Sequence, residues 1–200
     1  LRQVGMEMAR LHEVPAPDFL PDKHAYGLQV FSNVIGRNIN TEYESWLAKQ
    51  HDYLKQNIPS SLPCGLIHGD LFYDNVIFEE KKFRAIIDFE EACHYYKAFD
   101  LGMGILGLCV ENASVVLDKA HALVNGYQQV RKLEQIEKET LQIFVQYAAA
   151  ATSCWRFWKY HIDTPGTDNV NKHWQMMQIA EDVSNISKTR FLEAVFESEK

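Results

Sequence analysis

The sequence predicts a mainly helical α+β fold with one small β-hairpin. Apolar residues recur at helical spacing over most of the chain, whereas β-rich runs are confined to residues 64–89. The chain has 200 residues, of which 46% are hydrophobic and 24% charged. This composition is ordinary for a globular protein and provides enough apolar material for one sizeable core.

The charge and the apolar runs exclude several kinds of partner. The formal net charge is −7, whereas a phosphate-backbone binder needs a basic face, so nucleic acid is not an expected partner. No apolar run reaches the ~18–20 residues that span a bilayer, and the first residues lack the features of a signal peptide. The four cysteines contain no CxxC pair, which favours reduced thiols. We therefore expect a cytoplasmic protein with no nucleic-acid or membrane partner.

Two helices joined by an extended link are expected in the first third of the chain. Apolar residues at positions 4, 8 and 11 share one helical face, but no capping residue precedes them. We therefore expect this chain to start within a larger protein. Prolines 15, 17 and 21 predict a stiff link. The second helix is expected from Thr41 to about Ile58, with Thr41 and Glu44 forming a capping box.

The strand signals are confined to residues 64–89. Residues 65–67 are a short apolar run, and residues 76–78 and 85–89 are rich in strand-forming side chains. The charged segment 79–82 lies between the last two runs and predicts a hairpin with an exposed tip.

Everything after about Ala98 is expected to be helical. Periodic apolar residues indicate one helix around residues 116–127, a long one from Leu133 to about His161 and a final one from about Asn171 to Phe196. The polar segment 163–168 is expected to be the loop between the last two helices.

The most informative stretch runs from His68 to Asn75 and has the form H-x-D-L-x-x-x-N. The sequence Ile87-Asp88-Phe89 follows it after one hairpin. This spacing is typical of a kinase catalytic loop followed by the Asp-Phe pair that holds magnesium. Asp and Asn are also common turn-formers, which is the alternative interpretation of the loop. The agreement of three spaced polar residues with a second Asp in an apolar run favours the functional interpretation.

Phosphoryl transfer explains why these residue types occur at this spacing. An acceptor hydroxyl must be oriented and must lose its proton, and Asp70 is the expected catalytic base. A divalent cation must neutralise the phosphates of ATP, and the Asn75 amide and the Asp88 carboxylate supply the oxygen ligands that Mg²⁺ prefers. These two residues flank a hairpin, so its turn brings them face to face. A local net charge of −4 over residues 68–100 also favours a metal-bridged nucleotide.

On these residues the chain resembles the superfamily of aminoglycoside phosphotransferases and choline kinases, and within it the type II homoserine kinase family. Further stretches carry the resemblance: Met8–His12, Ala92–Cys93, Phe99–Leu101, and Arg156–Trp158 followed by Pro165. The resemblance covers about residues 5–185. It implies a protein-kinase-like C-terminal lobe that forms a single domain over residues 1–200. Within that domain, the catalytic loop and metal hairpin would occupy residues 64–100 and a helical subdomain residues 101–197.

The resemblance also implies roles for individual residues. Asp70 would be the catalytic base, Asn75 and Asp88 would bind Mg²⁺ and through it the phosphates of ATP, and His68 would be a structural residue of the loop. Asp100 would fasten the catalytic loop through backbone hydrogen bonds. Asp is also a good helix N-cap, and both roles can hold at once for Asp100.

The implied reaction is ATP-dependent phosphotransfer to the hydroxyl of a small amino-containing alcohol. L-Homoserine is the first choice of acceptor, with choline, ethanolamine or an aminoglycoside as alternatives. Glu90 and Glu91 are candidates to face a substrate ammonium, or they form a solvated charged pair. Arg156 is a candidate to bind the carboxylate that homoserine has and choline lacks, or it is an exposed helix residue. The aromatic run at 155–160 is interpreted as core.

Two further features qualify the kinase prediction. Gly102–Gly107 matches G-x-G-x-x-G but follows no strand directly, so close helix packing is favoured over nucleotide binding. The 67 residues before His68 contain no Gly-rich loop and no strand with the nucleotide-binding Lys. We therefore expect a C-terminal lobe whose N-terminal nucleotide-binding lobe is missing and which binds ATP weakly by itself. The rival hypothesis is a catalytically inert interaction module that kept this shape.

Overall fold

The computed structural model describes residues 1–197. The protein is mainly helical, as predicted, with helices α1 (Arg2–Glu13), α2 (Thr41–Asn57), α3 (Lys97–Leu108), α4 (Leu117–Val130), α5 (Gln135–Trp158), α6 (Lys172–Asn185) and α7 (Lys188–Phe196). Shorter helical segments are η1 (Leu28–Asn33), η2 (Tyr73–Asn75) and the π-helical η3 (Lys159–Asp163). Among these residues, no helix combines the length and the apolar character needed to cross a membrane.

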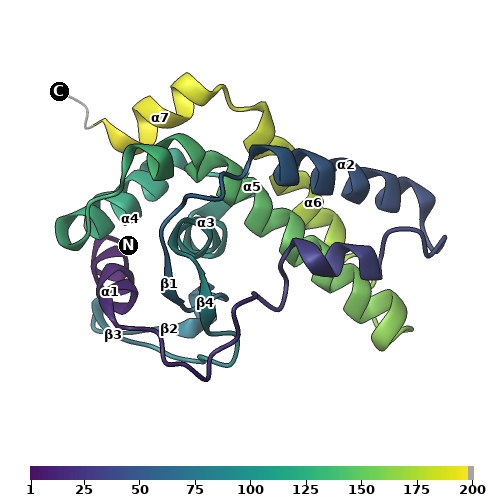
Figure 1. Cartoon of the computed structure of the whole chain (residues 1–200), viewed down its shortest axis with the longest axis horizontal. Helices are drawn as coiled ribbons and strands as arrows, with labels where there is room; N and C mark the ends of the chain where they lie inside the picture. The colour runs from purple at the N-terminus through teal and green to yellow at the C-terminus, as the bar shows by residue number, and fades with distance from the viewer. Residues whose placement is uncertain (198–200) are drawn as a thin grey trace.

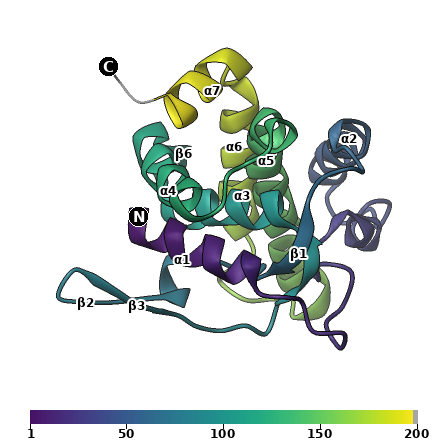
Figure 2. The ribbon, with the colours of Figure 1, turned by 60° about the vertical axis from the view of Figure 1, so that its left-hand side comes forward.

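The strands form antiparallel pairs. β1 (Cys64–Ile67) pairs with β4 (Cys93–Tyr96), β2 (Val76–Glu79) with β3 (Lys82–Ile86), and β5 (Val110–Glu111) with β6 (Ser114–Val115). The pair β2–β3 is the predicted hairpin, and Figure 2 shows it projecting from the helical body beside α1. Glu80 and Lys81 turn the chain at its tip with positive φ angles of 49° and 63°.

Helix α3 lies at the centre of the helical body, with α1 and α4 on one side and α5 on the other (Figure 1). Its side chains are apolar around the whole helix, and Phe99, Leu101, Met103 and Ile105 are fully buried. Its glycines permit this central position. A Cβ atom at Gly102 would lie 2.6 Å from the Phe144 carbonyl oxygen of α5, and one at Gly107 would overlap the Leu71 carbonyl oxygen of the catalytic loop. The G-x-G-x-x-G segment thus packs α3 directly beneath the catalytic loop.

Helices α1 and α4 pack backbone to backbone through two glycines. A Cβ at Gly5 would overlap the Leu123 carbonyl oxygen, and a Cβ at Gly126 would overlap the Arg2 carbonyl oxygen. This close approach carries His12, at the end of α1, to the side of Tyr127 on α4.

Substituting Gly126 by Ala is expected to lower the free energy of unfolding by about 1–3 kcal/mol, because the two helix backbones must separate. Gly104→Ala is the matched control, since its Cβ would meet only the mobile ends of side chains, with the closest contact at 3.2 Å to Met8 Cε. Both changes gain helix propensity, so the difference between them isolates the clash. Urea unfolding of the two variants measures this difference in the free energy of unfolding. Equal unfolding midpoints would contradict the close backbone contact between α1 and α4.

Two expected helices differ from those observed. The N-cap of α2 is Asn40, whose side chain accepts from the Tyr43 N–H at 3.0 Å, so the prediction of a Thr41–Glu44 capping box was wrong. Glu44 instead accepts backbone N–H groups of residues 38, 39 and 40 just before the helix. The final helix is split into α6 and α7, because Ile186 is extended and the Ser187 hydroxyl caps α7.

The strands differ from those expected in three places. The first is the short pair β5–β6, which lies at residues 110–115 where only helix was expected, so the prediction of a single hairpin was wrong. Strand β3 ends at Ile86, so residues 87–89 leave the hairpin and are free to enter the site. Strand β4 was not predicted, because its signal is four residues long and runs straight into α3. Its antiparallel pairing with β1 sets Ile67, just before the catalytic loop, opposite Cys93, and sets Cys64 opposite Tyr96, just before α3.

Candidate active site

The catalytic loop begins where β1 ends, and a buried carboxylate holds it in place. Asp100 Oδ1 accepts from the Gly69 N–H at 2.7 Å, and Asp100 Oδ2 accepts from the His68 N–H at 3.1 Å. Burial would raise the pKa of Asp100, but the hydrogen bonds from the His12 ring and the Gly69 N–H hold that pKa below its usual value. Asp100 therefore remains an anion that anchors the loop.

Asp100 is not a helix N-cap. Helix α3 starts at Lys97, its N-cap residue is Tyr96, and Asp100 lies in the first turn of the helix. Its carboxylate points at the catalytic loop, and that alternative role is wrong. The Gly69 turn is left-handed, with φ of 86°, and a Cβ there would lie 2.6 Å from the Glu91 carbonyl oxygen. Only glycine fits this turn and this contact.

His68 joins the catalytic loop to the end of the hairpin. Its Nε2 lies 2.8 Å from the Ile87 carbonyl oxygen, to which it must donate, and its Nδ1 accepts from the Asp70 N–H at 3.2 Å. Both ring nitrogens are thus engaged by backbone groups in the neutral tautomer. The side chain is buried, which suits a residue that shapes the loop.

Asn75 and Asp88 lie at the same end of the hairpin. Val76 pairs with Ile86, and the Ile87 N–H donates to the Asn75 carbonyl oxygen at 3.0 Å, so the two chains meet immediately before Asp88. Asp88 has a φ of 65°, a conformation that Asp tolerates better than most residues. The Asn75 Nδ2 donates to the Asp70 carbonyl oxygen at 2.8 Å, which ties the amide to the catalytic loop.

Asp70 lies in a negatively charged environment. Burial raises the pKa of Asp70 to about 6, and the negative charges of Glu91, Asp74 and Asp88 add to this rise. A carboxylate with a pKa near neutrality is matched to proton transfer at physiological pH.

The pH dependence of catalysis tests this electrostatic environment. If Asp70 is the catalytic base, as the sequence predicts, it must be deprotonated to act, and kcat/KM for the acceptor is expected to fall about tenfold per pH unit below about 6. Asp74→Asn removes a negative charge that raises the pKa of Asp70, so the acidic limb is expected to move to lower pH while the plateau stays constant. A pH–rate profile of both proteins measures the shift, and a limb that stays in place or moves upward would contradict the role assigned to Asp74.

The donor set fits a hard cation such as Mg²⁺. The nitrogen of the Asn75 amide is occupied by the Asp70 carbonyl, so the amide oxygen is the end available to a metal. Asp88 adds an exposed carboxylate. Within residues 1–197, no three His, Cys, Asp or Glu side chains are grouped to hold a metal by themselves. Two protein oxygens, completed by phosphates and water, are the usual magnesium arrangement in kinases.

Glu90 and Glu91 have different environments. Glu90 is exposed, whereas Glu91 accepts a hydrogen bond of 2.7 Å from the Tyr26 hydroxyl. Burial and Glu91 raise the pKa of Tyr26, so this hydroxyl stays protonated as a donor. Glu91 is therefore not part of a solvated pair. Tyr26 was missed in the sequence because it follows the proline-rich link and reaches the site only through the fold.

A cavity of about 250 Å³ opens beside Tyr26. It is lined by Ala25, Tyr26, Val30, Asn33, Cys154, Trp155 and Trp158. The Tyr26 and Trp155 ring centroids are 5.6 Å apart, and both tryptophans are only half-buried. The interpretation of the aromatic run as core holds for Phe157, which is fully buried. Trp158 packs against the core and also lines the cavity, whereas Trp155 lines the cavity only.

Arg156 is half-buried and is not a freely solvated helix residue. Its Nη1 donates to the Lys172 carbonyl oxygen at 3.2 Å, and burial lowers its pKa. The charges of Tyr160 and Asp70 oppose this shift of the Arg156 pKa. One edge of the guanidinium is thus fixed by the backbone at the first residue of α6.

Comparison with known proteins gives a consistent result. The profile of the phosphotransferase enzyme family (APH) matches residues 1–133. A homoserine kinase from Bartonella henselae is 31% identical over 94% of this chain and 63% of that protein. A homoserine kinase from Rhodopseudomonas palustris is 39% identical over 73% of this chain and 47% of that protein. The chain thus spans about half to two thirds of the length of these relatives.

Solved structures show the same fold at low sequence identity. A choline/ethanolamine kinase family protein from Mesorhizobium loti has a TM-score of 0.72 and 16% identity over 97% of this chain and 64% of that chain. A microcompartment-associated aminopropanol kinase has a TM-score of 0.66 and 15% identity over 96% of this chain and 63% of that chain. With a family profile that matches most of its length and the catalytic-loop geometry described above, the chain belongs to the phosphotransferase enzyme family.

Proposed function

We propose that this chain forms the C-terminal catalytic lobe of a cytoplasmic, ATP-dependent small-molecule kinase whose acceptor is the hydroxyl of a small amino alcohol, with L-homoserine as first choice. The observation that carries this proposal is the meeting of Asp70, Asn75 and Asp88 at one end of the hairpin, on a loop fastened by Asp100. Residues 64–100 provide the catalytic loop and metal hairpin, and residues 101–197 provide the helical subdomain that supports them.

Each residue has a defined part in the proposed reaction. Asp70 orients the acceptor hydroxyl and takes its proton as the hydroxyl oxygen bonds to the γ-phosphorus of ATP, while the bond to the β–γ bridging oxygen breaks and ADP leaves. Asn75 and Asp88 hold Mg²⁺, which when bound neutralises charge on the phosphates. His68 and Asp100 keep the loop in the conformation that aims Asp70.

The surroundings of Asp70 favour an acceptor with an ammonium and a carboxylate. The Glu91 carboxylate and the Tyr26 and Trp155 rings offer an anion and aromatic faces, both of which attract an ammonium. The guanidinium of Arg156 offers donors to a carboxylate. Homoserine carries both groups, and the relatives above are named homoserine kinases.

The phosphate cradle of a kinase also needs a Gly-rich loop and a lysine. Residues 1–197 hold no such pair ahead of the catalytic loop. We propose that an N-terminal nucleotide-binding lobe, outside these residues in the intact protein, completes the cradle.

The acceptor is identified by a direct assay. The intact gene product with MgATP is offered L-homoserine, choline and ethanolamine in parallel; ADP release is measured, and the phosphoester is observed by ³¹P NMR. The proposal predicts the highest kcat/KM for homoserine. Preference for choline or ethanolamine would overturn the first choice of acceptor. Absence of transfer to all three would favour the inert-module hypothesis.

Arg156→Ala is expected to raise KM for homoserine about 10- to 100-fold with a smaller change in kcat, because a charge-assisted bond to the carboxylate is lost. KM for ethanolamine, which has no carboxylate, is the internal control and is expected to stay within about twofold. Steady-state kinetics with homoserine and with ethanolamine measure the change in KM and kcat for each acceptor. Equal rises in KM for the two acceptors would show that Arg156 acts only by holding the start of α6.

A further inference from the structure

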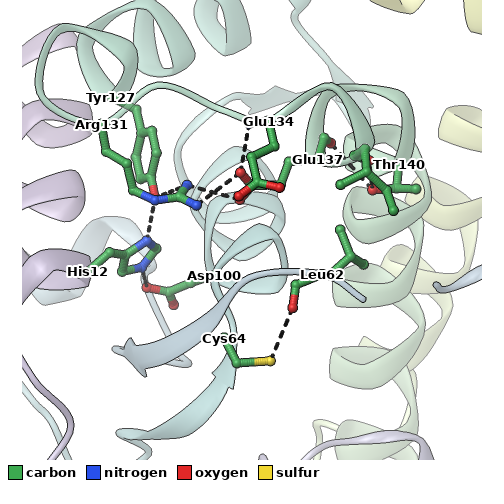
Figure 3. A network of polar contacts seen from close by, with 10 residues as sticks. His12, Leu62, Cys64, Asp100, Tyr127, Arg131, Glu134, Glu137 and Thr140 are labelled. Atoms are coloured by element: carbon green, nitrogen blue, oxygen red, sulfur yellow. Dashed lines mark hydrogen bonds and ion pairs between the residues drawn. The ribbon is translucent and has the colours of Figure 1, made fainter. Parts of the chain in front are cut away.

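A continuous series of buried and partly buried polar contacts links the catalytic loop to the turn between α4 and α5. His12 Nε2 lies 2.8 Å from Asp100 Oδ2, and His12 Nδ1 lies 2.6 Å from the Tyr127 hydroxyl (Figure 3). The Tyr127 hydroxyl in turn lies 3.2 Å from Arg131 Nη1. Arg131 also makes two hydrogen bonds of 2.9 Å to the Glu137 carboxylate.

Arg131 and Glu137, at the end of this series of contacts away from the catalytic loop, are firmly held. Glu137 is fully buried, and its Oε2 also accepts the Glu134 N–H at 2.9 Å as part of a capping box at the start of α5. A bidentate pair fixes both the position and the orientation of the Arg131 guanidinium. Its Nη1 is therefore held in place to donate to Tyr127.

Only one placement of the protons on Tyr127 and His12 gives every donor in this series of contacts an acceptor. Arg131 can only donate, so the Tyr127 oxygen accepts from it, and the Tyr127 O–H is left to donate to His12 Nδ1. His12 must then carry its proton on Nε2, where it donates to the Asp100 carboxylate. With a proton on Nδ1, the His12 ring would donate to Tyr127, and the buried hydroxyl hydrogen would have no acceptor among these four groups.

The result bears directly on the catalytic loop. Asp100 accepts two backbone N–H groups from the loop and one side-chain N–H from His12. Without the His12 donor, the Asp100 carboxylate is free to rotate, and its hydrogen bonds to the His68 and Gly69 N–H groups change length. Because Asp70 directly follows Gly69 in the loop, the Asp70 side chain would then be displaced.

We propose that Tyr127 and Arg131 are positioning residues for catalysis: they fix His12 in its Nε2–H tautomer and thereby complete the hydrogen-bond set that holds the catalytic loop on Asp100. This inference rests on the proposed kinase function for its effect on rate. The tautomer of His12 does not depend on that function.

The kinetic test is Tyr127→Phe in the intact gene product, which removes one hydroxyl and keeps the ring. We expect kcat to fall about 10- to 100-fold with KM for ATP and acceptor within about twofold, because the loop is misplaced while both substrates still bind. Tyr43→Phe is the matched control, since it removes another buried Tyr hydroxyl, bonded to Ser153 Oγ at 2.9 Å, away from this series of contacts. Arg131→Lys keeps a donor to Tyr127 but loses the bidentate pairing with Glu137. Its kcat is expected to lie between the values of wild type and Tyr127→Phe.

The structural test is ¹⁵N NMR of histidine-labelled protein, with the His12 signals assigned by their loss in His12→Asn. The proposal predicts the Nε2–H tautomer for His12 in wild type and in Tyr43→Phe, and a tautomer mixture in Tyr127→Phe. An Nδ1–H tautomer in wild type would overturn it, as would equal kcat values for the two Phe variants. If the wild type transfers phosphate to no acceptor, the proposed function fails, and the NMR result alone then decides whether Tyr127 fixes His12.

Discussion

Replacing Asp70 by Asn is expected to lower kcat by about 10²–10⁴-fold while the fold persists. The amide has nearly the shape of the carboxylate, but it cannot accept the proton of the acceptor hydroxyl. The backbone N–H of residue 70 still donates to His68 Nδ1, and its carbonyl still accepts from Asn75, so the loop keeps its hydrogen bonds. The loss is therefore expected in the chemical step, with KM for MgATP nearly unchanged.

Asp74→Asn is the matched control for Asp70→Asn. It makes the same change of charge four positions along the loop, on an exposed side chain, and kcat at about pH 8 is expected to stay within twofold of wild type. Single-turnover measurements on both variants separate chemistry from product release, and circular dichroism verifies the fold. An Asp70→Asn protein that keeps more than about a tenth of wild-type kcat would exclude Asp70 as the base.

Replacing Asp88 by Asn is expected to abolish tight magnesium binding and to lower kcat by at least about 100-fold. The site would then offer two neutral amides, and a hard divalent cation depends on carboxylate charge. Titration with Mg²⁺ at fixed ATP is expected to show a much higher concentration for half-maximal rate. The left-handed backbone at this position suits Asn as well as Asp, so stability is expected to change little.

Glu79→Gln is the control for Asp88→Asn. Glu79 lies at the other end of the hairpin and makes an exposed ion pair with Arg84, so its loss removes the same charge from the hairpin but not from the site. Unchanged magnesium dependence in Asp88→Asn, with or without an effect of Glu79→Gln, would rule out Asp88 as a ligand.

The local part of the site could be predicted from the sequence. The spacing of His68, Asp70 and Asn75 is fixed by a short loop, and the approach of Asn75 to Asp88 follows from pairing the two sides of one hairpin. These relations depend on nearby residues and on strand geometry, which periodicity reports well. The small hairpin in a helical domain was predicted for the same reason.

The acceptor side of the site could not be predicted in the same way. Tyr26 meets Glu91 across 65 positions of sequence, and His12 meets Asp100 across 88. Such contacts depend on how the helices pack, and a single sequence carries no signal for them beyond residue type. Trp155 and Trp158 have helical spacing that suits a core face, and only the packing of the link at residues 25–33 turns that face into the wall of a cavity.

The central claim is that Asp70, Asn75 and Asp88 act on one metal-bridged phosphate. The most direct measurement is a crystal structure of the intact gene product with Mg²⁺, a non-hydrolysable ATP analogue and L-homoserine. The claim predicts Mg²⁺ at about 2.1 Å from the Asn75 amide oxygen and from an Asp88 carboxylate oxygen, with Asp70 within hydrogen-bond distance of the homoserine hydroxyl. A metal held by other side chains, or an Asp70 carboxylate turned away from the hydroxyl, would contradict it.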